Sequence, residues 1–388
     1  KFAISFKDFA VKEKLDDSQL AELIAANFEL ANFEFIRYKT KPKEGWNFVE
    51  QIIVTGAVSV AAKKGFVRGQ TIGRQVNECR ELANTPGGEM TPQLLAAAAK
   101  KAARNTVIRV RVLQTGEMSR LKMGGILGVS KGSSEKPCFI IMEYKKGGKE
   151  KPIVLVGKGV TFDSGGINIK PEAGMNEMHM DMSGGAAVIH AIALAARLRL
   201  KKNVIALIPA VENMVSGSSY RPGDILRSMS GKTIEVQNTD AEGRIILADG
   251  LHYAKRYDPK IVIDVATLTG AAVVALGQRC TALFTRDEKF ERLFRSAGEQ
   301  VGDYAWPLPL WDEYEQEIKG TFGDVTNLGK TRYGGAITAA MFLYQFIKGT
   351  PWVHLDIAPR MTATDGEYLA KGAAGAPVQL LLEVIERL

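Results

Sequence analysis

The chain has 388 residues, 46% of them hydrophobic and 24% charged, and a formal net charge of +8. This is ordinary globular composition with enough length for two domains, and three widely separated cysteines exclude a disulfide scaffold. No run approaches the roughly 18 apolar residues of a membrane span, and the first residues lack the apolar stretch of a signal peptide, so we expect a cytoplasmic protein without a membrane partner.

The first elements predicted along the chain are mainly helical. Residues 1–48 have the pattern of a helix followed by polar material, and residues 49–56 that of a strand. A helix is predicted from about 57 to 83, where the segment NTPGG at 84–88 stops it. Thr91-Pro92 then opens another helix, with an N-cap residue followed by proline.

From residue 107 onward, short apolar runs alternate with helical stretches. Strands are predicted at 107–113, 138–144, 152–157, 203–212, 233–237 and 261–267, and helices at about 184–199 and 242–256. This alternation is typical of the α/β class, with a mainly parallel sheet flanked by helices on both faces. Ligands of such sheets bind beyond the carboxyl ends of the strands, where the polar clusters of this sequence stand.

Positive charge is concentrated in residues 61–150, which carry 17 Lys/Arg against 7 Asp/Glu. A basic stretch can bind nucleic acid, but it is more often a solvated face. We therefore keep nucleic acid only as the lesser alternative among partners.

The segment QNTDAEGR at 237–244 follows one predicted strand directly. In an extended chain, Asp240, Glu242 and Arg244 would point the same way. Two carboxylates on one face need a cation between them or a raised pKa. The alternative is that Asp240 and Glu242 begin a helix, where acids suit the dipole, with Arg244 as their salt-bridge partner.

Two further polar segments, GKGVTFDSGG at 157–166 and the stretch 170–181, add more charged side chains. The first could be a plain glycine-rich turn. A serine-protease site is disfavoured because no histidine stands in a matching upstream segment, and the phosphate-loop pattern is absent. Four carboxylates with only scattered histidines favour hard or borderline divalent ions, and a bridged pair of metals would neutralise that charge.

These segments resemble the leucyl aminopeptidase (cytosol aminopeptidase) family of two-metal exopeptidases. The resemblance rests on KGVTFDSGGINIK at 158–170, MDMSGGAA at 180–187 and NTDAEGR at 238–244, and extends to ATLTG at 266–270, GGAITAA at 334–340 and HLDIA at 354–358. It implies that residues 66–388 are the catalytic metallo-aminopeptidase domain and that residues 1–65 are a partial N-terminal α/β domain with its linker. It also implies a homohexamer built as a dimer of trimers.

The resemblance further implies roles for individual residues. Lys158 and Asp181 would ligate one metal and Asp240 the other, with two bridging carboxylates, Asp163 and Glu242. Lys170 would face the scissile carbonyl, and Arg244 would hold a bicarbonate ion that shuttles a proton. The pocket for the first side chain would be framed by Met178, Asn238, Thr267, Leu268 and Gly270.

The function implied is release of the N-terminal residue, preferably leucine or methionine, from peptide substrates by a metal-bound water. The two divalent ions would be zinc or manganese, with magnesium or cobalt as alternatives. The other function considered is a DNA-binding regulator or recombination accessory on the same fold, motivated by the basic stretch 61–150.

Overall fold

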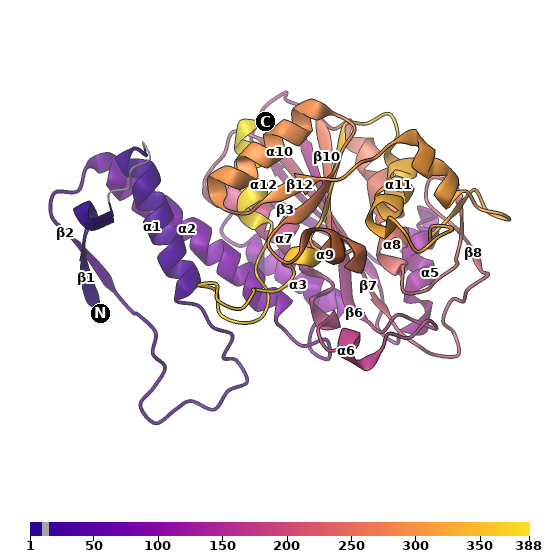
Figure 1. Ribbon diagram of the computed structural model, residues 1–388, viewed down its shortest axis with the longest axis horizontal. Coiled ribbons are helices and arrows are strands. Elements are labelled where there is room, and N and C mark those ends of the chain that lie inside the picture. The colour runs from indigo at the N-terminus through magenta and orange to yellow at the C-terminus, as the bar shows by residue number, and fades with distance from the viewer. Residues whose placement is uncertain (10–14) are drawn as a thin grey trace.

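The alternation of apolar strands and amphipathic helices produces one nine-stranded sheet flanked by helices in the computed structural model, which describes residues 1–9 and 15–388 (Figure 1). The strand order is β12-β11-β14-β10-β5-β7-β4-β3, and β6 also pairs with β7. The strands of this sheet are β3 (Arg109–Leu113), β4 (Cys138–Lys145), β5 (Ile153–Gly157), β6 (Gly159–Asp163), β7 (Asn203–Asn213), β10 (Ile261–Ala266), β11 (Thr281–Phe284), β12 (Ala305–Pro307) and β14 (Trp352–Asp356).

The central strands of the sheet are parallel. β14, β10, β5 and β7 pair with one another in parallel, whereas β3, β4 and β11 form antiparallel pairings nearer the edges. The predicted mainly parallel sheet is confirmed. Because the central strands share a direction, their carboxyl ends meet at one edge, which is where the candidate site forms.

Helices cover both faces of the sheet because successive strand residues point to opposite sides. Ile153 and Leu155 of β5 belong to one apolar core, and Val154 and Val156 to the other. The first core is covered by α2 (Val60–Ala83), α3 (Pro92–Ala102), α7 (Ser183–Arg197), α10 (Glu288–Val301) and α12 (Val378–Arg387). The second is covered by α4 (Thr115–Arg120), α5 (Gly124–Val129), α8 (Glu242–Ala254), α9 (Gly270–Leu276) and α11 (Gly335–Ile347).

The remaining elements of the larger body are short. One predicted strand, 233–237, is wrongly placed in the main sheet: β9 (Thr233–Glu235) lies in a separate sheet between β8 (Ile225–Arg227) and β13 (Val325–Thr326). The other short helices are α6 (Glu172–Met175), η2 (Ser130–Gly132), η3 (Met178–Met180), η4 (Lys255–Tyr257), η5 (Asp312–Ile318) and η6 (Ala358–Arg360). Among the described residues, no helix combines the length and apolarity required to cross a membrane.

The N-terminal elements form a smaller body beside the main one, at the left of Figure 1. β1 (Phe2–Ser5) pairs in parallel with β2 (Ile52–Thr55), and between them come η1 (Phe6–Phe9) and α1 (Asp17–Ala31). The helix predicted within residues 1–48 is confirmed as α1. The prediction is wrong for Phe2–Ser5, which form the strand β1, and residues 10–14 lie outside the residues that the structure describes. A small separate core forms here, and α2 runs on from this region into the main body.

Candidate metal centre

Three buried carboxylates meet at the carboxyl edge of the central strands. Asp163 ends β6, Asp181 precedes α7, and Glu242 begins α8. Each offers an oxygen that lies within 4.8 Å of the others, and all three residues are at most 3% exposed. Carboxylates so close together repel one another strongly away from water, so the cluster needs positive charge.

Lys158 supplies part of that charge from the end of β5. Its Nζ lies 2.8 Å from Asp181 Oδ2 and 2.8 Å from Glu242 Oε1, and it donates a 2.9 Å hydrogen bond to the carbonyl of Thr267. Burial alone lowers the pKa of Lys158, but the charges of Asp181 and Glu242 outweigh it and raise that pKa above its usual value.

Lys170 supplies the other positive charge at the opposite end of the cluster. Its Nζ lies 2.9 Å from Asp163 Oδ2 and 2.5 Å from Asp240 Oδ1. Asp240 is the most exposed of the four acids, with 34% of its side chain accessible. The cluster therefore has an enclosed end around Lys158 and a more open end around Lys170.

Burial leaves two of the three carboxylates incompletely compensated, whereas Lys158 and Lys170 lower the pKa of Glu242 despite its burial. Burial, reinforced by the charge of Glu242, raises the pKa of Asp163 to about 7, and burial also raises the pKa of Asp181. Among the described residues, the buried Glu242 Oε2 has no hydrogen-bond partner. Clustered oxygen donors with an unsatisfied buried oxygen fit divalent metal ions, which bind carboxylates and relieve their repulsion.

Two glycines keep the centre open at points of close approach. A side chain at Gly243, in the first turn of α8, would place its Cβ 2.6 Å from Lys158 Nζ. Gly165 has a φ of +87°, and a Cβ there would lie 2.5 Å from the carbonyl of Asn168 and 3.0 Å from Asp240 Oδ1. Both positions therefore require glycine if Lys158 and Asp240 are to stay in place.

The segment 240–244 is not extended as predicted; the helix-start alternative is correct. Glu242 and Arg244 lie in the first turn of α8, so the alternation of an extended chain does not apply. The salt-bridge part of that alternative is wrong, because within residues 15–388 Arg244 donates instead to the carbonyl of Asn327, at 2.9 Å.

Arg244 is a buried cation with spare donor capacity. Burial lowers the pKa of Arg244 to about 10, although the negative charges of Glu242 and Asp356 act to raise it. Its Nε finds no hydrogen-bond partner among the described residues. A guanidinium in this state can receive an anion.

A cleft of about 270 Å³ joins Arg244 to the metal centre. It is lined by Lys170, Asn238, Asp240, Arg244, Leu268 and Gly270, together with residues of the segment 328–338. The lining thus brings five predicted catalytic or pocket residues together with Asp240, namely Lys170, Arg244, Asn238, Leu268 and Gly270. Met178 and Thr267 are not part of this lining: Thr267 instead donates to Asp181 Oδ1 at 2.7 Å.

Several side chains that hold the centre in place were not predicted from the sequence. Asn213, at the end of β7, donates to Asp163 Oδ1 at 2.8 Å and to the carbonyl of Thr239 at 2.9 Å. Asp356, at the end of β14, accepts from the Leu268 amide at 3.0 Å and the Thr269 hydroxyl at 2.7 Å. Both are polar residues that end buried strands, so the strand-end rule that singled out Asp163 could have found them.

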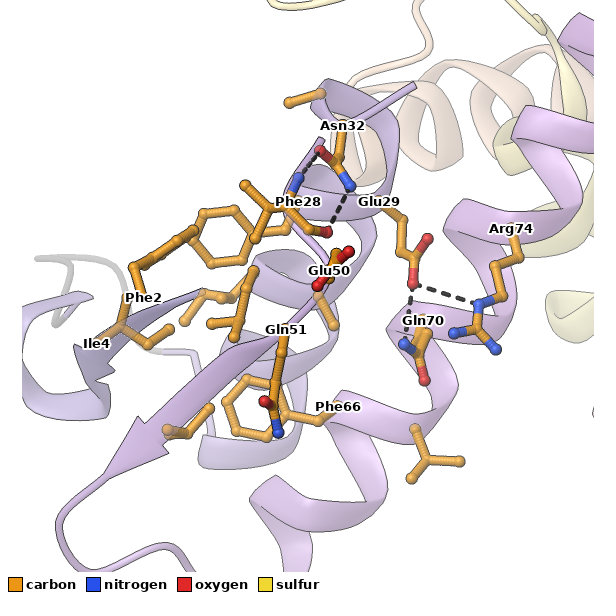
Figure 2. Close-up of a pocket in the computed structure, with 17 residues that line it drawn as sticks. Phe2, Ile4, Phe28, Glu29, Asn32, Glu50, Gln51, Phe66, Gln70 and Arg74 are labelled. Atoms are coloured by element: carbon orange, nitrogen blue, oxygen red, sulfur yellow. Dashed lines mark hydrogen bonds and ion pairs between the residues drawn. The ribbon is translucent and has the colours of Figure 1, made fainter. Parts of the chain in front are cut away.

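A larger cavity, of about 530 Å³, lies elsewhere, in the N-terminal body between α1, α2 and the two N-terminal strands (Figure 2). Apolar side chains such as Phe2, Ile4, Phe28 and Phe66 dominate the view, with Glu29 bridging Gln70 and Arg74 at one side. None of the predicted site residues lines it. The larger cavity is therefore separate from the metal centre.

Known proteins similar to this chain share its fold and much of its sequence. Residues 77–382 match the family described as "Cytosol aminopeptidase family, catalytic domain". A probable cytosol aminopeptidase of Chlorobaculum tepidum is 44% identical over 98% of this chain and 77% of its own length. A second, from Geobacter sulfurreducens, is 45% identical over 94% of this chain and 74% of its own length. The bottromycin maturation enzyme BotP, solved in complex with Mn, superposes with a TM-score of 0.90 at 32% identity, over 97% of this chain and 81% of that one. Family match, relatives, fold and buried acidic centre agree, and the chain belongs to the cytosol (leucyl) aminopeptidase family of metal-dependent peptide hydrolases.

Proposed function

We propose that this chain releases N-terminal residues from peptides, preferably leucine or methionine, by a hydrolysis that needs two divalent ions in the buried carboxylate cluster. The observation that carries the proposal is the group of Asp163, Asp181 and Glu242, buried within 4.8 Å of one another beside two lysines. An unassisted cluster of this kind would be strongly unfavourable, and paired metals are a common solution for hydrolytic sites.

The two ends of the cluster support two separate ligand sets. At the enclosed end, Asp181 and Lys158 would hold one metal; at the open end, Asp240 would hold the other. Asp163 and Glu242 contact opposite lysines and would bridge the two ions. Lys158 can ligate only as a neutral amine, a state that a nearby dication favours by repelling its proton.

When bound, the ions would polarise the scissile carbonyl and lower the pKa of the attacking water. Lys170, whose ammonium lies at the open end, would stabilise the negative oxygen of the tetrahedral intermediate. Arg244 would hold bicarbonate in the cleft, which its side chain helps to line. The first side chain of the substrate would lie against Asn238, Leu268 and Gly270, and Met178 and Thr267 would frame the pocket from outside this lining.

Zinc or manganese is the proposed metal, with magnesium or cobalt as alternatives, because carboxylate oxygens and one amine suit all four ions. The presence of Mn in the structurally similar BotP supports manganese in particular.

We also propose a two-domain division at 65/66 and a hexameric assembly of two trimers. The separate small core near the N-terminus supports two units, which α2 (Val60–Ala83) joins across the 65/66 boundary. Several large apolar side chains are strongly exposed, among them Val274 at 89% and Phe322 at 82%. Such apolar exposure favours burial in an assembly.

The DNA-binding alternative depends on the basic stretch 61–150. In the structure, cations of this stretch are spread over both faces of the sheet, and several pair with carboxylates: Arg68, Arg74, Arg111 and Lys145. Pairing weakens the field that would attract phosphates. A titration with duplex DNA at two salt concentrations tests this alternative, which needs affinity that falls steeply with salt.

The direct test of the proposed function is turnover on a panel of peptides that differ only in the N-terminal residue. The protein is stripped of metal and then reconstituted with zinc, manganese, magnesium or cobalt. We expect no turnover without metal and the highest kcat/KM for leucine and methionine. Equal turnover across the panel, or turnover that survives chelation, would contradict the proposal.

A further inference from the structure

Asn327 is a fully buried residue that directly follows β13 and reaches the loop between β9 and α8. We propose that Asn327 is a positioning residue for the hydrolysis: it fixes the loop that carries Asp240 and orients Arg244. The inference rests on the proposed function, because it assigns a role to these two residues in that reaction.

The side chain of Asn327 bridges the whole loop. Its Oδ1 accepts from the amide of Gln237 at 2.8 Å and, at 3.4 Å, from that of Asn238. Its Nδ2 donates to the carbonyl of Asn238 at 2.6 Å and to that of Ala241 at 3.3 Å. One carboxamide thus spans residues 237–241, and Asp240 lies inside the span.

The main chain of Asn327 also contacts Arg244 and the strand β9. Its carbonyl accepts the 2.9 Å hydrogen bond from Arg244 Nη1, and its amide donates to the carbonyl of Glu235 at 3.1 Å. A shift of Asn327 would therefore move Asp240 and Arg244 together. No other group contacts both the Asp240 loop and the Arg244 guanidinium through hydrogen bonds among the described residues.

The chemistry requires an amide at this position. Asparagine has both a carbonyl acceptor and an NH2 donor, whereas aspartate keeps the acceptors and loses the donors, and alanine loses both. Either change would leave buried main-chain groups of the loop without partners. The loop would relax away from its position, although the fold around it is built by other contacts.

Asn203 offers a matched control far from the metal centre. It begins β7, at the end of the strand opposite Asn213, and its carboxamide also holds a loop. Its Oδ1 accepts from the amide of Gly147 at 2.9 Å, and its Nδ2 donates to the carbonyl of Glu150 at 2.7 Å. Alanine and aspartate variants at Asn203 therefore remove similar hydrogen bonds without touching the proposed site.

The experiment compares Asn327→Ala, Asn327→Asp, Asn203→Ala and Asn203→Asp with the wild type. Each metal-free protein is titrated with Mn²⁺, and kcat and KM are measured for a leucyl peptide together with the thermal midpoint. We expect both Asn327 variants to lose about 10- to 100-fold in affinity for one of two Mn²⁺ ions and a similar factor in kcat. The Asn203 variants should keep wild-type Mn²⁺ affinity and kcat even where their midpoints fall.

Two results would overturn the inference. One is an Asn327→Asp protein with wild-type Mn²⁺ affinity and kcat; the other is an equal loss of affinity in the Asn203 variants, which would reduce the effect to general destabilisation. A wild-type protein that binds no Mn²⁺ and releases no N-terminal residue would overturn the proposed function and this inference with it. The state of the wild type therefore separates the two failures.

Discussion

Lys158 and Lys170 have the same side chain but different surroundings. Lys158 is 4% exposed and contacts two carboxylates and a carbonyl, whereas Lys170 is 15% exposed at the open end. An enclosed amine can become a neutral ligand when a dication binds nearby, while an ammonium facing the cleft can act on substrate. These surroundings are the basis for assigning the two lysines different roles.

Replacing Lys158 with arginine tests its role as a ligand. Arginine stays charged at any workable pH, so it cannot become a neutral donor. We expect Lys158→Arg to bind only one metal and to lose more than about 100-fold in activity. This loss exceeds the one usually seen when a residue that only contacts a metal ligand is replaced. The control is Lys151→Arg, since Lys151 is an exposed lysine paired with Asp258. Metal analysis that finds two ions in active Lys158→Arg would exclude the ligand role.

Alanine substitutions at Lys170 and Arg244 should have different consequences. Lys170→Ala should lower kcat by about 10²- to 10³-fold with little change in metal content, as for removal of one oxyanion donor. Arg244→Ala should be milder and should recover in part when bicarbonate is added. Steady-state kinetics with and without bicarbonate make the comparison, and equal losses that bicarbonate does not restore would refute both assignments.

The raised pKa of Asp163 links pH to metal binding and stability. Folded Asp163 keeps its proton up to a pKa of about 7, whereas an unfolded aspartate releases it near 4. The metal-free folded state thus binds more protons, so its free energy of unfolding should fall as pH rises between these values. Mn²⁺ affinity should fall as pH drops below about 7, because proton and metal compete.

Asp249 provides the control for this pH dependence. Burial also raises its pKa to about 7, but it accepts from the amides of Ile126 and Met229 outside the metal centre. Asp249→Asn should change the pH dependence of unfolding and leave Mn²⁺ titrations unaltered, whereas Asp163→Asn should change both. Unaltered Mn²⁺ binding in Asp163→Asn would contradict the assignment.

At the scale of elements, several buried strands were predictable from the local pattern, whereas the equally buried β14 was not predicted and β9 was placed in the wrong sheet. β5, β7 and β10 are continuous buried runs, so their existence and parallel pairing followed from the sequence. β9 has three residues, and its partners β8 and β13 come from both sides of it in sequence, so no local pattern placed it in a second sheet. Asn327 was missed for the same reason, because its contacts with Gln237 and Asn238 span about 90 residues.

Helix α8 brings Glu242, Gly243 and Arg244 to the centre in its first turn. Alanine normally stabilises a helix relative to glycine by about 1 kcal/mol. At Gly243 the added Cβ would instead meet Lys158 Cε and Nζ, both at 2.6 Å, and the flexible lysine would have to move.

We therefore expect Gly243→Ala to fold with near wild-type stability but with weaker metal affinity. Gly116→Ala in α4, where a Cβ meets nothing within 4 Å, is the control and should bind metal normally. Calorimetric titration of both metal-free variants with Mn²⁺ makes the test. Wild-type affinity in Gly243→Ala would mean that the position of Lys158 does not matter for binding.

For the whole molecule, the α/β fold and the metal centre come from one arrangement. Parallel β14, β10, β5 and β7 bring Asp356, Lys158 and Asn213 to one edge, and β6 adds Asp163. The N-terminal body contributes its own core and cavity and none of the predicted site residues. The sequence motifs singled out these residues because the proposed ligands cluster in three short segments; the residues that hold those segments in place come from distant parts of the chain.

The central claim is that the buried carboxylates hold two divalent ions on which hydrolysis depends. The most direct measurement is the number of Mn²⁺ ions bound per chain, by calorimetric titration and elemental analysis, in metal-free wild type and in Asp163→Ala. Asp163 is proposed to touch both ions, so its loss should disturb both sites. We predict two ions and metal-dependent release of N-terminal leucine for the wild type, with fewer than two ions and no turnover for Asp163→Ala. Two ions still bound in Asp163→Ala, or wild-type turnover without metal, would contradict the account.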